Sequence, residues 1–303
     1  MKMAVFSAFL AFATYMCDGN DKKESTDCAN DRKEPDQGLV CNENVVLSEP
    51  SEQGVFAFKT TLYVNISSAG IIETETYSRI LGILHLTKSP MGEDLQIELC
   101  DLLIPAVSIP GQAGPTEMIM VSNVYPELAP AQTSMTVENY TTCSDVSFPM
   151  VSFIFSAVLP DPLNDSLPDT GLCSGTSPPC ITDMDNDSNP GVTFEALNVP
   201  GIDVRSIYMI MRSTMDFSGI IGSEDLLLGN SMWTIEQKAV GCTIVPLGQT
   251  NPRPCNESEL DIVRKVNPRL EMVPSKAGSL IGRRTGPISC EDLLLSEDEI
   301  FGR

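Results

Sequence analysis

From about residue 54 the chain consists of short runs rich in Val, Ile, Phe, Tyr and Thr, separated by Pro, Gly, Asn and Asp. The first group of residues favours pleated strands, and the second group favours turns. Such runs at fairly regular spacing are typical of an antiparallel sandwich or barrel. The sequence therefore predicts an all-β fold of about ten strands. The expected strands cover residues 55–66, 71–77, 78–86 (continuing that strand or forming the next), 94–100, 117–124, 134–140, 148–159, 192–197, 204–217, 231–240 and 259–266.

Helix signals are few, and the best lies at the C-terminal end. Ser289 is a favourable N-cap, and acidic residues follow it where a first helical turn would begin. We therefore expect a short helix or turn at 288–301, fixed by Cys290. Residues 159–191 form a Pro- and Cys-rich connection with few packing residues. A loop of that length is usually functional or rigidified by other means.

The N-terminal residues 1–16 combine one lysine with an uncharged apolar run, which is the pattern of a signal peptide. A membrane-spanning helix would need roughly 20 apolar residues. Two processing routes are open: cleavage at the A-x-A motif of residues 11–13, or lipid attachment at Cys17, as in a bacterial lipoprotein. Residues 17–50 are polar and charged, so we expect a disordered acidic tether. A single β domain is expected at 51–303.

Cysteine usage supports export. The chain has ten cysteines and no C-x-x-C pair, so disulfides are expected, and neither zinc knuckles nor thioredoxin-type chemistry has its spacing. If Cys17 carries lipid, one of the other nine stays unpaired. Short intervening stretches favour Cys28 with Cys41, Cys100 with Cys143, and Cys173 with Cys180, and leave open the partners of Cys242, Cys255 and Cys290.

The net negative charge of the chain limits the kinds of molecule that it is expected to bind. Asp and Glu number 41 against 19 Lys and Arg, for a net charge of -22. A nucleic-acid partner is not expected, because phosphate contacts need clustered Lys and Arg. Membrane contact is expected only through an N-terminal lipid. The single histidine, His85, excludes zinc hydrolases that need two or three, and Glu73 and Glu75 are interpreted as a solvent-facing pair rather than an acid/base pair.

One motif carries chemistry. Asp183, Asp185 and Asp187 occupy alternate positions, which match positions 1, 3 and 5 of a calcium loop. A serine replaces the glycine usual at the sixth position, and the nearest later acid comes one place after the usual closing acid. The sequence favours a structural calcium site over a solvated Asp-rich turn. The candidate ligands are Asp183, Asp185, Asp187, Asn189 and Glu195.

The segment 183–193 has the pattern D-x-D-x-D-x-x-P-G-V-T, followed by RSIYMIMRSTMDFSG at 205–219 and LGNSMWTIEQKAVG at 228–241. These motifs resemble a group of uncharacterised exported β proteins and lipoproteins from myxobacteria and related bacteria. The resemblance covers roughly residues 180–300 and includes a late cysteine, here Cys290. It implies an exported β protein and carries no activity.

These features predict an exported cell-envelope or extracellular structural or binding module with a structural calcium loop and no catalysis. The location would be the bacterial cell envelope, as an outer-membrane lipoprotein, or the extracellular space. One alternative is a lipocalin-like carrier of an apolar small molecule, with Phe153, Phe155, Met209 and Met211 around a cavity. The second is a glycan-active enzyme, which needs two carboxylates about 5–10 Å apart in a cleft. The partner, whether protein, glycan or apolar ligand, is not identified by the sequence.

Overall fold

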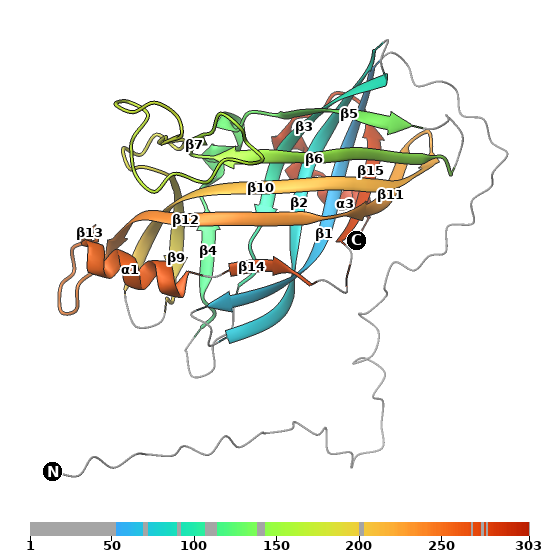
Figure 1. Cartoon of the computed structure of the whole chain (residues 1–303). Coiled ribbons are helices and arrows are strands. Elements are labelled where there is room, and N and C mark those ends of the chain that lie inside the picture. Colours follow the sequence, from blue (N-terminus) through green and yellow to red (C-terminus); the bar gives the residue numbers. More distant parts are fainter. Residues whose placement is uncertain are drawn as a thin grey trace, which may run out of the picture. The chain divides into compact units, whose positions relative to one another are not determined.

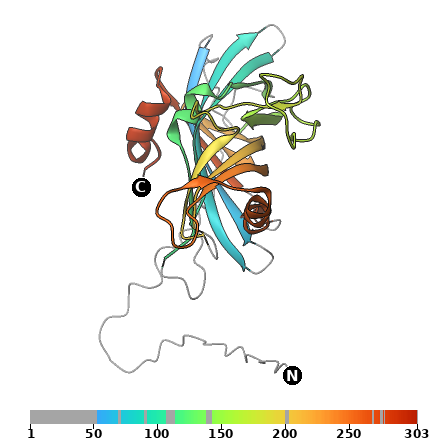
Figure 2. The ribbon, with the colours of Figure 1, turned by 90° about the vertical axis from the view of Figure 1, so that its left-hand side faces the viewer.

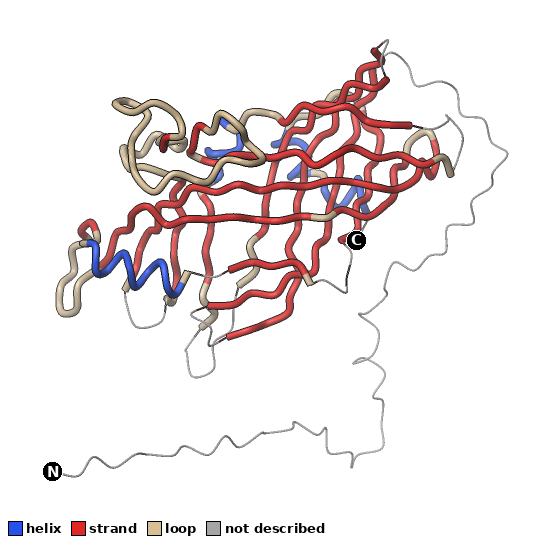
Figure 3. Tube along the Cα trace, in the orientation of Figure 1, coloured by secondary structure: helices blue, strands red, loops and turns tan. Residues whose placement is uncertain are grey.

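Strands dominate the part of the chain that the computed structural model describes (Figure 3). All of that part belongs to one compact unit, Cys41–Arg303. The predicted signal peptide, the tether, the lipid site at Cys17 and the Cys28–Cys41 disulfide lie outside the described residues. The described residues are 53–68, 72–89, 92–106, 114–137, 143–199, 203–267, 269–273, 276 and 278–302.

The elements follow one another with few helices between strands. The strands are β1 (Gln53–Ser68), β2 (Ile72–Ser89), β3 (Gly92–Leu103), β4 (Glu117–Met120), β5 (Ala131–Val137), β6 (Asp145–Phe155), β7 (Ala157–Val158), β8 (Cys180–Ile181), β9 (Val192–Leu197), β10 (Val204–Ser223), β11 (Leu226–Ser231), β12 (Trp233–Ile244), β13 (Arg253–Pro254), β14 (Arg269–Met272) and β15 (Gly278–Thr285). The helices are η1 (Ser122–Glu127), α1 (Glu257–Val266), α2 (Cys290–Leu295) and α3 (Glu297–Phe301). None of these helices is long and apolar enough to cross a membrane.

A single large antiparallel sheet organises the unit, which confirms the expected all-β fold (Figure 1). Its strands are hydrogen bonded in the order β11-β15-β1-β2-β3-β5-β6-β10-β12-β13. Because β10 also pairs with β11, the pairings from β11 to β10 form a closed circuit. Beside this path, β14 pairs with β1, β9 with β10, and β4 with β9.

The long hairpin of β1 and β2 shows why these residues form strands. In β1 the side chains of Phe56, Phe58 and Leu62 are buried, whereas intervening Lys59 and Tyr63 are partly exposed. This alternation is what a strand with one face on the core requires. The expected runs at 71–77 and 78–86 form the single strand β2, whose residues Ile72–Thr87 pair with β1.

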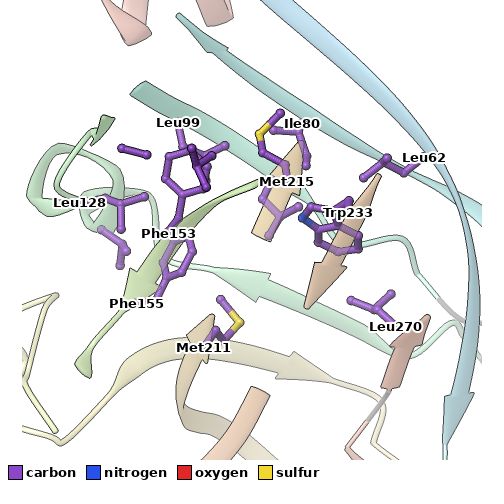
Figure 4. Close-up of a cluster of buried hydrophobic side chains, with 14 of the residues drawn as sticks. Leu62, Ile80, Leu99, Leu128, Phe153, Phe155, Met211, Met215, Trp233 and Leu270 are labelled. Atoms are coloured by element: carbon purple, nitrogen blue, oxygen red, sulfur yellow. The ribbon is translucent and has the colours of Figure 1, made fainter. Parts of the chain in front are cut away.

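The core is formed by apolar side chains from several strands that point toward one another (Figure 4). Trp233 is 1% exposed, and its indole nitrogen donates a hydrogen bond of 2.6 Å to Ser213 Oγ. That bond satisfies the one polar atom of the buried ring. The residues named for a carrier cavity, Phe153, Phe155, Met209 and Met211, all belong to this core cluster.

The C-terminal helices cover the outer face of β1, β2 and β3 (Figure 2). Leu293 of α2 is fully buried against Leu81 and Ile83, and Glu297 of α3 forms ion pairs with Lys59 and Arg79. As expected, α2 begins after Ser289, whose side chain accepts a hydrogen bond from the Asp292 amide at 3.1 Å. The predicted C-terminal helix therefore exists, as two short pieces.

The connection 159–191 covers another part of the outer face. Leu159, Leu167 and Ile181 bury Ile210 of β10. Lysine and arginine side chains of the sheet donate to its carbonyl groups, including Arg212 to Asp165 O at 2.6 Å and Lys238 to Leu167 O at 2.9 Å. The loop is thus packed on the sheet through a few apolar side chains and hydrogen bonds, whereas residues 174–179 are exposed. Figure 2 shows it on the opposite side from α2 and α3.

Two predicted strands differ from the structure. The run at 259–266 is not a strand but lies in α1, where Asn256 and Glu259 form a reciprocal capping box. Leu260 and Val263 are buried three residues apart, as on one face of a helix. The run at 117–124 stops at Met120, and η1 begins at Ser122.

The disulfides confirm one predicted pair and correct another. The predicted Cys173–Cys180 disulfide is formed. Cys242 and Cys255, whose partners the sequence left open, are bonded to each other. The predicted Cys100–Cys143 pair is wrong, because Cys100 bonds Cys290, 190 residues away. Cys143 is disulfide-bonded as well. Proximity along the sequence failed here because α2 folds back onto β3.

Candidate metal centre

The Asp-rich loop lies between β8 and β9. It is closed at its base by a backbone hydrogen bond of 2.9 Å from the Gly191 amide to the Thr182 carbonyl. Gly191 has a φ of 101°, and a Cβ there would lie 2.9 Å from the Met209 amide nitrogen. Asn186 and Ser188 adopt φ values of 58° and 74°. Ser188 thus has the left-handed conformation that glycine adopts without strain, which explains why glycine is usual at this position.

The loop brings three carboxylates together, as the sequence predicts. One oxygen from each of Asp183, Asp185 and Asp187 lies within 4.8 Å of the others. The Asp183 carboxylate accepts backbone hydrogen bonds from Asp187 at 3.2 Å and Ser188 at 2.8 Å. Asp187 accepts two hydrogen bonds from Asn189, from its amide nitrogen at 2.8 Å and its side chain at 3.0 Å. These bonds turn the carboxylates toward a common centre.

Asp185 is the inner member of the group. It is 6% exposed, and its Oδ2 accepts a hydrogen bond of 2.7 Å from the Thr193 amide. Its Oδ1 is buried and has no hydrogen-bond partner in the described part of the chain. A buried carboxylate oxygen without a donor is costly unless a proton or a cation neutralises it.

The electrostatics of the group reflect this crowding. Burial raises the pKa of the Asp185 carboxyl against the hydrogen bonds from Thr193, and the charge of Asp187 raises it further. For Asp187, burial is outweighed by hydrogen bonds from Asn189 and Thr193, so its pKa is lowered. The two neighbouring carboxyls therefore differ in how readily they lose a proton.

The other predicted ligands lie differently. Asn189 directs its amide and side-chain nitrogens to Asp187, so it supports a carboxylate. Glu195 is exposed in the middle of β9 and is not part of the carboxylate group. It lies two residues beyond Thr193, on the same face of the strand, and continued strand geometry carries it away from the loop.

Two residues that sequence reasoning missed contact the loop. Thr193 donates to Asp185 through its amide and to Asp187 through its hydroxyl, the latter at 2.9 Å. Asn123 of η1 donates from its side chain to the main-chain oxygen of Asp185 at 2.9 Å. Thr193 could have been found, because it is part of the motif. Asn123 could not, because it is 62 residues away and has no pattern of its own.

A second group of possible ligands has a simpler explanation. Glu98, Cys100 and Cys290 also lie close together, but the two cysteines share a disulfide, and sulfur binds a metal as a thiolate. His85 lies beside this group, with its Nε2 3.6 Å from Glu98 Oε2 and its side chain 36% exposed. His85 pairs with Val55 of β1 and Gln96 of β3, so it lies inside the sheet with a partly exposed side chain.

Glu73 and Glu75 of β2 lie near the end of the β1–β2 hairpin. Glu75 is exposed and forms an ion pair with Lys276, while Glu73 faces Ser67 in the register of β1 and β2. The Asp183–Asp187 group is therefore the candidate site that geometry favours. Compared with known proteins, the chain matches no family model, no curated protein and no solved structure.

Proposed function

We propose that this chain is an exported cell-envelope or extracellular structural or binding module that holds one calcium ion in its Asp183–Asp187 loop and has no catalytic role. The observation that carries the proposal is the buried Asp185 Oδ1, which has no hydrogen-bond donor among the described residues and lies beside two further carboxylates. Calcium takes 6–8 oxygen ligands at about 2.3–2.6 Å and accepts flexible geometry. The ion would supply the missing partner and relieve the repulsion among the three carboxylates.

The disulfides support the export part of the proposal. Cys100–Cys290 links α2 to β3, Cys242–Cys255 links the segment before α1 to β12, and Cys173–Cys180 closes a short loop within the connection 159–191. Such bonds persist in oxidising compartments. The N-terminal apolar run and Cys17, which the sequence predicts to be a signal peptide and a lipid site, agree with this part of the proposal. Lipid attachment is tested by mass spectrometry of the mature protein, in which a diacylglyceryl group on Cys17 is expected; A-x-A cleavage would instead leave an unmodified new N-terminus.

Calcium binding is tested by calorimetric titration of the full chain. We expect one calcium ion per chain and an affinity that falls at least about ten-fold in Asp185→Asn, because this variant removes the inner charge. Glu195→Gln is the matched control, since it removes a nearby acid outside the carboxylate group. Equal binding by the wild type and Asp185→Asn would contradict the proposal, and so would a loss confined to Glu195→Gln.

The two alternatives can be tested on the same material. A lipocalin-like carrier would retain an organic mass through desalting in native mass spectrometry, whereas the proposed module has its polypeptide mass plus one calcium. A glycan-active enzyme would release reducing ends from glycans, and we expect no release. Either positive result would replace the proposed function.

A further inference from the structure

Asp185 connects the Asp-rich loop to two other elements. Its side chain accepts from the Thr193 amide at the start of β9, and its main-chain oxygen accepts from Asn123 of η1. The carbonyl oxygen of Thr193 in turn accepts a hydrogen bond of 3.2 Å from the Val121 amide, between β4 and η1. Asp185 is therefore linked to the segment Met118–Leu128 by two routes, one through Thr193 and the other through Asn123.

That segment covers part of the core. Val124 of η1 is fully buried, and Leu128 is 6% exposed in the same core cluster. The Tyr125 hydroxyl accepts a hydrogen bond of 2.8 Å from the Leu102 amide of β3. When this segment is in place, it therefore shields apolar core side chains from water.

Apart from these core contacts, the segment has limited strand pairing among the described residues. Among the described strands, β4 pairs only with β9, through four residue pairs (Figure 1). Asn123 is exposed, so its bond to Asp185 is not protected by burial. Short edge strands with few partners open more readily than central strands.

We propose that calcium in the Asp183–Asp187 loop regulates the seating of β4 and η1 on the core, and that its removal releases Met118–Leu128. This inference rests on the proposed calcium binding. Without the cation, mutual repulsion moves the three carboxylates apart. This displaces the side-chain oxygen of Asp185 that accepts a hydrogen bond from Thr193 and the main-chain oxygen that accepts one from Asn123. The calcium-free segment then exposes Val124 and Leu128, creating an apolar surface that the calcium-bound protein hides.

Hydrogen exchange of the full chain, followed by mass spectrometry, tests this inference. Calcium that binds only the state in which the segment is seated lowers the equilibrium constant for opening. The factor is one plus the ratio of the calcium concentration to Kd. At a calcium concentration about ten times Kd, amide exchange in Met118–Leu128 should therefore be about ten-fold slower than in chelator. The α2 peptide Cys290–Leu295 is the internal reference, and its exchange should not respond.

Asn123→Ala separates coupling from binding. It removes the bond to Asp185 while keeping all three carboxylates, so calcium still slows exchange in residues 182–193 but has a much smaller effect on Met118–Leu128. In Asp185→Asn, neither segment responds. If calcium binds the wild type and exchange in Met118–Leu128 is unchanged, the inference is overturned and the proposed function stands. If calcium does not bind, both fail.

Discussion

Ser188 shows how one residue can introduce backbone strain into a loop. Its φ of 74° lies in the left-handed region, which costs a non-glycine residue roughly 1–2 kcal/mol. Its amide nevertheless donates to Asp183 at 2.8 Å, so the conformation is needed by the loop. Ser188 stands where the sequence pattern of a calcium loop usually has glycine, and the physical consequence is a left-handed backbone conformation at a non-glycine residue.

Replacing Ser188 by glycine should therefore strengthen the site. The substitution keeps the amide donor and removes the strain, so we expect Ser188→Gly to raise stability by about 1 kcal/mol and to tighten calcium binding. Urea unfolding and calorimetric titration measure the two effects. Asn186→Gly is the matched control, because asparagine tolerates its φ of 58° and little gain is expected. A larger gain in the control would refute this explanation.

Gly82 is a residue at which the sheet allows no side chain. A Cβ there would lie 2.3 Å from the Glu98 carbonyl oxygen and 2.5 Å from the Phe58 ring. We expect Gly82→Ala to destabilise the protein by roughly 1–3 kcal/mol through overpacking. In the control Gly54→Ala, the nearest atom is 3.4 Å away. Denaturant unfolding of the two variants compares them, and equal stability would disprove the close approach.

At the scale of elements, the sequence predicts strands well where alternation is strong. The expected runs at 55–66 and 192–197 match β1 and β9, because one face of each strand is buried. The run at 259–266 failed because apolar residues in so short a segment fit a strand and a helix alike. The capping box of Asn256 and Glu259 was the signal that could have decided it.

The capping box also makes α1 sensitive to pH. A hydrogen bond from Arg253, helped by the Asn256 amide, lowers the pKa of Glu259 from 4.5 to about 2. A lowered carboxyl pKa gives stability that is present above the unfolded value and is lost as pH falls toward the folded one. We therefore expect Glu259→Gln to destabilise the protein at pH 6, with a difference from the wild type that shrinks between about pH 4.5 and pH 2.

Thermal unfolding followed by circular dichroism at several pH values measures this difference. Glu257→Gln is the control, because Glu257 is exposed in the first turn but takes no part in the capping box. A Glu259→Gln deficit that stays constant from pH 6 to pH 2 would show that the carboxylate does not act through its charge.

At the scale of the whole molecule, the disulfides differ most in the length of chain they close. Cys100–Cys290 spans 190 residues and Cys173–Cys180 spans 7. In the chain-entropy model these loops correspond to about 5 and about 2 kcal/mol. We expect Cys100→Ser with Cys290→Ser to lower the denaturation midpoint more than Cys173→Ser with Cys180→Ser, as measured in guanidinium chloride. The opposite order would indicate that local packing outweighs chain entropy.

Long-range contacts are also what the sequence could least predict. It placed the three carboxylates in one loop, because their spacing is local. It did not show that Glu195 lies outside the carboxylate group, and it missed Asn123, because both depend on how β9 and η1 lie against the loop. The Cys100–Cys290 bond likewise depends on the packing of α2 on β3. The three carboxylates of the candidate site could therefore be predicted from their local spacing. The more distant residues that hold the loop in place depend on the sheet topology.

The central claim is that the Asp183–Asp187 loop holds calcium, and diffraction from crystals of the full chain grown with calcium tests it most directly. Anomalous scattering should give one peak about 2.3–2.6 Å from oxygens of Asp183, Asp185 and Asp187, including Asp185 Oδ1. The peak should be absent from crystals of Asp185→Asn. A loop without such a peak, or with Asp185 Oδ1 hydrogen bonded to water alone, would contradict the account.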